Sequence, residues 1–282
     1  MIGRSFNEPV IDDDNYHLVT KIGGYGLVPR DFSLHPTGSL EGCVTYGAIK
    51  DQIPLVEWAD MPGLIAEKVA KKTLTSDIRL AMPGGPFTNL DQGNSNLCWA
   101  YASVHALMIA RMLCNLPTVY LSGHAVGYKI KNGRNQGGWS AHSAEFIMKN
   151  GVPSVNKWPA QSWSASFNNE ATWEEAKQYR FAEGFIDLDA PIYDRDLSFQ
   201  QLLTLLIWNI PCPVDYNWQS HAVLAIDPVD CYPNLPATNP RRYGVRILNS
   251  WKNWGDRGTG VYTQNKAVPD NACGMRAPLL SS

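Results

Sequence analysis

The sequence predicts an α+β protein, with helices in the first part of the folded region and strands in the last part. Apolar residues recur at helical spacing in 98–114 and 198–208, whereas short β-branched and aromatic runs follow residue 210. Elements that segregate in this way favour an α+β layout over a series of βαβ units. With 282 residues, of which 44% are hydrophobic, the chain can bury a sizeable core.

Each element is expected from its own local pattern. Residues 140–149 follow Ser140 as a predicted cap and end before Asn150-Gly151, and Ser198 with Gln201 is typical of a capping box. The prolines of residues 227–240 predict a long loop between two strands. The expected helices are 61–72, 98–114, 140–149, 173–180 and 198–208, and the expected strands are 214–218, 222–226, 243–248 and 260–263.

Composition and charge exclude several functions. Lys and Arg number 24 against 26 Asp and Glu, so no basic excess favours nucleic acid. No run approaches the roughly 20 apolar residues of a membrane helix, and the first residues lack the apolar core of a secretion signal. The six cysteines show no zinc-binding spacing, so neither a metal nor another cofactor is expected. These features predict a cytoplasmic protein.

Cys98 stands where a polar, glycine-containing loop enters the longest expected helix. The start of a helix carries partial positive charge and unpaired N–H groups, which favour a thiolate over a thiol. The position therefore predicts a nucleophilic cysteine. The alternative is a small buried residue that opens a core helix, since free cysteine is among the most buried residue types.

Three segments in chain order resemble the papain-like cysteine peptidase family. A glutamine-glycine pair stands shortly before Cys-Trp-Ala-Tyr, a His-Ala-Val strand follows, and Asn-Ser-Trp comes later with Trp-Gly and Gly-Thr-Gly behind it. His221 and Asn249 follow Cys98 by 123 and 151 residues, close to the ~130–150 residues expected in this family. The first segment comprises Gln92-Gly93 and Cys98–Tyr101, the second is Ser220–Ile226, and the third comprises Asn249–Trp251, Trp254-Gly255 and Gly258–Gly260.

The resemblance implies a role for each residue. Cys98 would be the nucleophile, and its backbone N–H and the Gln92 amide would form the oxyanion hole. His221 would act as acid and base, paired with Cys98 as thiolate and imidazolium, and Asn249 would orient its ring. Trp251 would cover the bond between those two side chains and exclude water from it.

A glycine pair before the third expected helix resembles the substrate-binding loop of the family. The loop is Asn135–Ser140, and its Gly137 and Gly138 would pair through the backbone with an extended substrate. Trp139 would line the pocket for the second residue of the substrate. The alternative is an ordinary turn that caps a helix.

The resemblance covers residues 76–282 and implies a two-lobed fold, with a helical lobe at about 76–185 and a β lobe at about 186–282. Residues 1–75 form an N-terminal extension that loosely resembles leaders of bacteriophage-encoded members. It would be a latency segment, a docking arm for a virion or another protein, or a permanent part of the fold.

The sequence departs from the family pattern around the site. Ser95-Asn96-Leu97 precedes Cys98 where family members have Cys-Gly-Ser, and the partner cysteine near the glycine loop is missing, so the family disulfide cannot form. Ser220 replaces the common acid before the histidine. The extra loop 227–240 is expected to overhang the cleft and narrow its specificity.

The sequence thus predicts a thiol-dependent peptidase that acts on a peptide or protein, with no nucleic acid or membrane partner. Two alternatives remain open: a virion-associated or other structural protein that kept the fold, and a cell-wall amide hydrolase.

Overall fold

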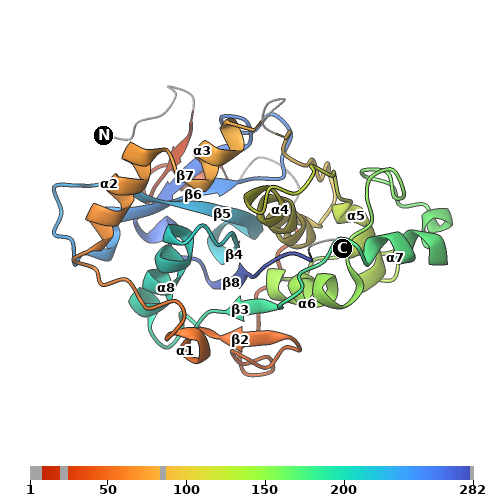
Figure 1. Cartoon of the computed structure of the whole chain (residues 1–282), viewed down its shortest axis with the longest axis horizontal. Helices are drawn as coiled ribbons and strands as arrows, with labels where there is room; N and C mark the ends of the chain where they lie inside the picture. The colour runs from red at the N-terminus through yellow and green to blue at the C-terminus, as the bar shows by residue number, and fades with distance from the viewer. Residues whose placement is uncertain (1–7, 20–24, 83–86, 280–282) are drawn as a thin grey trace.

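The computed structural model describes residues 8–19, 25–82 and 87–279, which form two lobes (Figure 1). One lobe contains an eight-stranded sheet, and the other is helical. The α+β fold that the sequence predicts is confirmed. The helices are α1 (Tyr46–Ile49), α2 (Met61–Lys71), α3 (Thr75–Leu80), α4 (Cys98–Leu113), α5 (Gly123–Ile130), α6 (Ser140–Asn150), α7 (Glu170–Ala176) and α8 (Arg195–Ile207).

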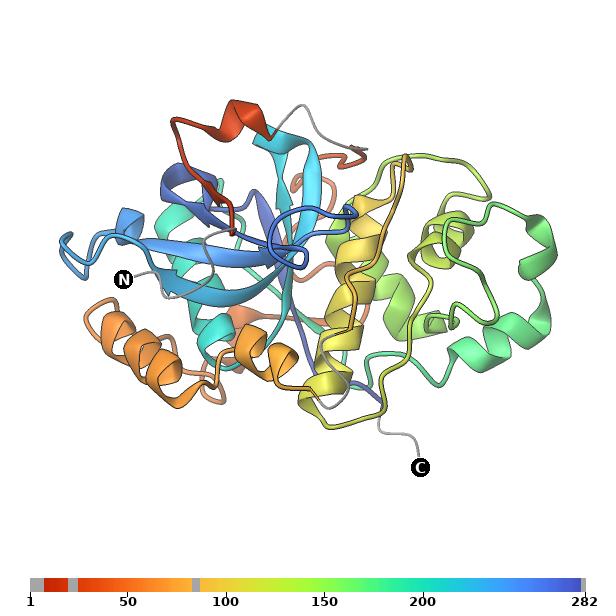
Figure 2. The ribbon, with the colours of Figure 1, turned by 90° about the horizontal axis from the view of Figure 1, so that it is seen from above.

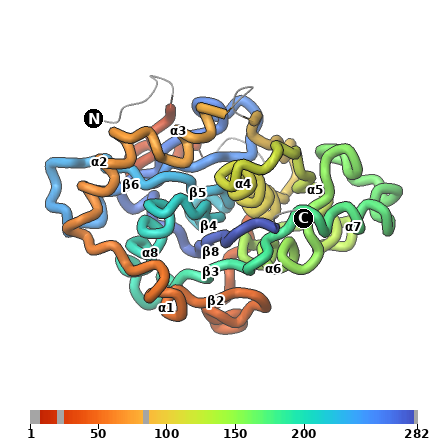
Figure 3. The backbone as a smooth tube through the Cα atoms, in the orientation of Figure 1, coloured from red at the N-terminus to blue at the C-terminus, as the bar shows by residue number. Residues whose placement is uncertain are grey.

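The sheet has the order β1-β7-β6-β5-β4-β8-β3-β2, and its inner pairs are all antiparallel. Both edge strands come from the N-terminal part of the chain and run parallel to their neighbours. The short strands at Val10–Ile11 and Cys43–Thr45 therefore extend the sheet at both edges (Figure 3). The strands are β1 (Val10–Ile11), β2 (Cys43–Thr45), β3 (Phe185–Asp187), β4 (Cys212–Tyr216), β5 (His221–Asp230), β6 (Tyr243–Leu248), β7 (Thr259–Thr263) and β8 (Asn271–Met275).

The strand β5 connects the two hydrophobic cores because it is buried on both faces. Ala222, Leu224 and Ile226 belong to the cluster that contains α4, whereas Val223 and Ala225 belong to the cluster around α8. This alternation is the period of two expected for a strand. The helix α4 is buried at every residue except Leu113 and lies between the lobes in Figure 2. Its packing on β5 brings the start of the helix beside the start of the strand.

Several local predictions need correction. The first helical residue of α6 is Ser140, whose hydroxyl donates to Asp215 instead of capping the helix. The helix α8 is capped by Asp194, which accepts from the Leu197 N–H at 2.9 Å, so the predicted capping box at Ser198 is wrong. The helices α1, α3 and α5 and the strands β1, β2, β3 and β8 were not expected, since most are short or lie at edges, where local patterns are weak.

The prediction that loop 227–240 overhangs the cleft is wrong. The strand β5 continues to Asp230, so the connecting segment is 231–242. A strand of ten residues spans roughly 30 Å and carries this loop to the far end of the sheet. There the loop lies beside α2, with Pro233 and Pro62 lining one cavity, at the end opposite α4 in Figure 1.

A buried ion pair holds the N-terminal part of the chain against the sheet. Arg30 donates to both carboxylate oxygens of Asp187 on β3, at 2.7 and 2.9 Å, and both side chains are fully buried. Asp187 also accepts from the Gly38 N–H at 2.8 Å. Buried pairs of this kind cost much to break, because the remaining charge loses its partner.

No helix among the described residues is long and apolar enough to cross a membrane.

Replacing Asp187 with alanine should lower the free energy of unfolding by about 3–5 kcal/mol, because Arg30 would stay buried without its counter-charge. Urea denaturation measures the loss. The exposed pair of Glu174 with Lys177 provides the control, since Glu174→Ala should change stability by less than about 0.5 kcal/mol. Equal stability of the two variants would contradict the role of the buried pair.

Candidate active site

Cys98 is the first residue of α4 and is completely buried. Its sulfur lies next to the backbone N–H of Ala222, the second residue of β5. The helix begins without a side-chain cap at Leu97. The sulfur is therefore placed at the start of the long helix and against the strand that begins with His221.

His221 and Asn249 form a direct pair, as the resemblance of their segments to the peptidase family implies. The Nε2 atom of His221 lies 2.9 Å from the Oδ1 atom of Asn249, and the opposite ring nitrogen, Nδ1, has no hydrogen-bond partner among the described residues. Trp251 stacks on the imidazole with ring centroids 4.3 Å apart. All three side chains are buried, so the indole shields the bond between His221 and Asn249 from solvent.

Gln92 is buried and is held by hydrogen bonds to Ser95 and Ser250. Its Oε1 atom accepts from the Ser250 hydroxyl at 2.7 Å, its Nε2 atom donates to the Ser95 carbonyl at 2.8 Å, and its backbone N–H donates to the Ser250 carbonyl at 2.9 Å. The Ser250 backbone N–H in turn donates to Asn249 at 2.7 Å. Ser250 thus connects the glutamine to the residue that orients the histidine.

His105 supports the same loop. It lies two turns after Cys98 on α4, and its Nε2 atom accepts from the Leu90 N–H at 2.8 Å. Burial and the charge of Arg79 lower the pKa of His105 to about 3, so the ring is neutral and accepts this bond over the whole physiological range. No sequence pattern indicated this partner of His105, because the bond is made to a backbone group.

The predicted glycine loop lies beside α4. A Cβ atom on Gly138 would meet the Trp99 ring at 2.7 Å, and one on Gly137 would meet the Gly26 carbonyl oxygen at 2.6 Å. Only glycine therefore fits at either position without displacement. Trp139 is half-buried, and its ring lies 5.3 Å from that of His35.

The backbone partner of this glycine loop is a segment of the chain itself, residues 25–28, which we call the plug. Gly138 donates to the Gly26 carbonyl at 2.9 Å and accepts from the Val28 N–H at 2.8 Å, which makes a parallel bridge at Leu27. The N–H groups of Gly26 and Leu27 point to the Ser220 carbonyl, at 3.3 and 3.2 Å.

The plug spans the gap between the two lobes next to Cys98 and His221. A Cβ atom on Gly26 would lie 2.2 Å from the carbonyl oxygen of Asn96, two residues before Cys98, and Ser220 directly precedes His221. Tyr25 packs edge-on against Trp251, with ring centroids 6.3 Å apart. The sequence analysis placed these residues only within the N-terminal extension, since nothing local reveals which surface a loop covers.

We call the structure with the plug bonded to Gly138 the closed form. In this form, burial sets the protonation of Cys98 and His221. Desolvation raises the pKa of Cys98 to about 12 and lowers that of His221 to about 4, although the bond to Asn249 partly opposes the second shift. Burial disfavours the charged form of each group. The thiol and the imidazole are therefore neutral at pH 7 in this form, whereas the sequence predicts a thiolate–imidazolium pair.

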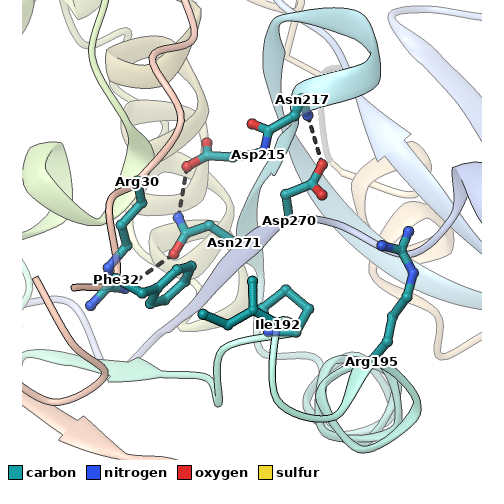
Figure 4. Close-up of a pocket in the computed structure, with 9 residues that line it drawn as sticks. Arg30, Phe32, Ile192, Arg195, Asp215, Asn217, Asp270 and Asn271 are labelled. Atoms are coloured by element: carbon teal, nitrogen blue, oxygen red, sulfur yellow. Dashed lines mark hydrogen bonds between the residues drawn. The ribbon is translucent and has the colours of Figure 1, made fainter.

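A second polar cluster lies beside the glycine loop. Asp215 on β4 accepts from the Ser140 backbone N–H at 3.2 Å, from its hydroxyl at 2.5 Å, and from the Asn271 side chain at 2.6 Å. Asn271 also accepts from Arg30 at 3.1 Å. Arg30, Asp215 and Asn271 line a cavity of about 180 Å³ together with Phe32 (Figure 4).

The structure thus joins Gln92, His221, Asn249 and Trp251 in one network, with Cys98 against the strand that begins with His221. Among the described residues, no group of three His, Cys, Asp or Glu side chains could hold a metal ion. The sequence missed Ser250, whose role depends on a contact with Gln92 from a distant segment, and it missed the plug. The Asn-Ser-Trp motif contained Ser250, but the pattern did not show where its hydroxyl points.

The two lobes, with α4 packed on the central strand of the sheet, form the papain-like cysteine protease fold. Xylellain, a cysteine protease from Xylella fastidiosa, aligns with a TM-score of 0.56 and 18% identity over 90% of this chain and 96% of its own.

Two further solved structures have the same fold. Digestive procathepsin L 3 from the Tenebrio molitor larval midgut aligns with a TM-score of 0.51 and 16% identity, over 83% of this chain and 92% of its own. The proform of Amb a 11, a cysteine protease and major ragweed pollen allergen, aligns with a TM-score of 0.54 and 14% identity, over 96% of this chain and 79% of its own. No protein-family model and no curated protein matches the sequence.

The buried Asp215 should give the protein an unusual pH dependence. Desolvation raises its pKa from 3.8 to about 6, so the folded chain binds this proton more tightly than the unfolded chain does. Its contribution to stability is present at pH 4 and is lost as the pH rises to about 6. Replacing it with asparagine should remove this loss, which amounts to up to about 3 kcal/mol.

Urea denaturation of wild type and Asp215→Asn from pH 4 to 7 tests the effect. The difference between the two free energies of unfolding should grow to pH 6 and then stay constant. Parallel profiles would show that Asp215 titrates normally.

Proposed function

We propose that this protein is a thiol peptidase in which Cys98 attacks the peptide carbonyl, His221 transfers the proton and Asn249 orients His221. The observation that carries the proposal is the shielded bond between His221 and Asn249, at the start of the strand whose next N–H contacts the Cys98 sulfur. Acyl transfer of this kind requires a nucleophile near a base that a third group orients, and here the Cys98 sulfur lies against the strand that begins with His221.

The reaction divides into two steps. The proton of the Cys98 thiol passes to His221, the sulfur bonds to the carbonyl carbon, and the Gln92 amide and the Cys98 N–H stabilise the negative oxygen. His221 then protonates the leaving amine as the C–N bond breaks, which leaves an acyl-enzyme. A water molecule, deprotonated by the same imidazole, hydrolyses the thioester and restores the thiol.

The substrate would be an extended peptide that pairs with Gly138. Its backbone would use the N–H and the carbonyl that the plug uses in this structure. Gly137 would allow that backbone to approach closely, and Trp139 would form an apolar wall of the neighbouring pocket. Trp251 would face the leaving side of the bond, because it covers His221.

The plug supports the latency role among those predicted for residues 1–75, since it takes the backbone groups that a substrate needs. The predicted bacteriophage origin, the docking arm for a virion, the cytoplasmic location and the cell-wall amide substrate stay predictions. The similar structures come from a bacterium, an insect and ragweed, and their names mention neither a virion nor a cell wall.

Replacing Cys98 with alanine should abolish peptide hydrolysis and leave the fold intact, because the thiol forms the covalent intermediate. Incubation with a peptide library and mass spectrometry of the products measures the activity. Cys114, which is exposed at the end of α4, offers the control: Cys114→Ala should hydrolyse as wild type does. Cleavage by Cys98→Ala at the wild-type rate would sink the proposal.

Replacing Ser250 with alanine should lower kcat about fivefold and change KM little. The hydroxyl that holds the Gln92 carbonyl oxygen would be lost, at a cost of about 1 kcal/mol in the oxyanion hole. Steady-state kinetics separates the two constants, and threonine at this position should restore part of kcat. An unchanged kcat would show that Gln92 does not depend on this bond.

A further inference from the structure

The plug and a substrate cannot occupy the cleft together. Gly138 offers one N–H and one carbonyl to an extended partner, and both are taken by Gly26 and Val28. Leu27, between them, is buried against the helical lobe. The closed form is therefore inactive if, as proposed above, Cys98 is the nucleophile.

One end of the plug is anchored by Arg30. All five N–H donors of its guanidinium are used: Nε donates to the His35 carbonyl at 2.9 Å, Nη1 to Asp187 and Asn271 at 2.7 and 3.1 Å, and Nη2 to the Pro36 carbonyl and Asp187, both at 2.9 Å. A fully paired, buried guanidinium is a strong and specific anchor.

The chain before the plug is anchored as well. Glu8 accepts two hydrogen bonds from Arg246, at 2.8 and 3.0 Å, and both side chains are buried. The strand β1 pairs with β7, and Lys266 places its Nζ atom 3.6 Å from the centre of the Tyr16 ring. The chain after the plug continues into β2, which is an edge strand of the same sheet.

The plug itself is held more weakly than its anchors. Two long hydrogen bonds, of 3.3 and 3.2 Å, join it to the β lobe through the shared Ser220 carbonyl, beside the edge-on contact of Tyr25 with Trp251, and Val28 is 49% exposed. Segments with few buried contacts and exposed backbone bonds open locally at low free-energy cost, whereas the anchored parts open only with the whole domain.

We propose that residues 25–28 form a resident plug, which stays attached on both sides and leaves the cleft by local opening with the chain uncut. The peptidase is thus regulated by an equilibrium between a closed and an open form of one intact chain. A substrate peptide competes with the plug for Gly138, so its apparent affinity is its intrinsic affinity multiplied by the open fraction.

Gly26→Ala tests the plug, because its new Cβ would meet the Asn96 backbone and push the segment out. Gly63→Ala on α2 is the matched control, since a Cβ there meets nothing within 4 Å. Each full-length protein is treated with iodoacetamide, and peptide mapping gives the rate of modification at Cys98. The exposed Cys114 serves as the internal reference.

We expect Cys98 of Gly26→Ala to react at least tenfold faster than in wild type, with Gly63→Ala unchanged and the labelled chain at its full mass. Equal rates in wild type and Gly26→Ala would overturn the proposal, and so would labelling confined to shortened chains, which would indicate activation by cleavage. Leu27→Asn, which weakens the plug without the steric change, should also react faster.

Arg30→Lys tests the anchor, since lysine keeps the charge and loses the paired geometry. If the circular dichroism spectrum of the variant matches that of wild type, Cys98 should react several-fold faster than in wild type. An unchanged rate would overturn the anchoring role of Arg30. Alkylation requires only an accessible thiol and does not depend on peptide hydrolysis. Faster labelling without cleavage of any peptide would therefore contradict the proposed peptidase activity and still support the proposal of a resident plug.

Discussion

The packing of α4 on β5 is the contact on which the rest of the site depends. The helix is buried almost all round, and the inward face of the strand supplies Ala222, Leu224 and Ile226 to the same core. Because each element is rigid and regular, this apolar contact places the first residue of the helix, Cys98, against the first residues of the strand. The polar chemistry of the site is thus positioned by a nonpolar interface.

The polar residues of the site then fix one another. His221 is bonded to Asn249, Asn249 accepts from the Ser250 N–H, and the Ser250 hydroxyl holds Gln92. Each group is buried, so a missing partner would leave an unsatisfied polar atom at a cost of about 1–3 kcal/mol. A network of this kind allows a single arrangement, which is what a site for developing negative charge needs.

The N-terminal part of the chain has two physical roles in the structure. Its strands β1 and β2 cover both edges of the sheet, which would otherwise expose unpaired backbone groups. Between them, the plug lies across Gly138 and next to Ser220, and burial keeps the thiol and the imidazole neutral. One segment therefore completes the fold and closes the cleft.

The sequence alone determined the α+β class and the extent of α4 and β6, and it singled out the residues of the candidate site, because these depend on local periodicity and on short motifs with fixed chemistry. It failed for the start of α8, whose cap is Asp194, and for loop 227–240, whose position follows from the length of β5. It also could not show that Arg30 pairs with Asp187 or that residues 25–28 lie on Gly138. Only the tertiary structure decided these points, because each contact joins segments far apart along the chain and leaves no local pattern in either.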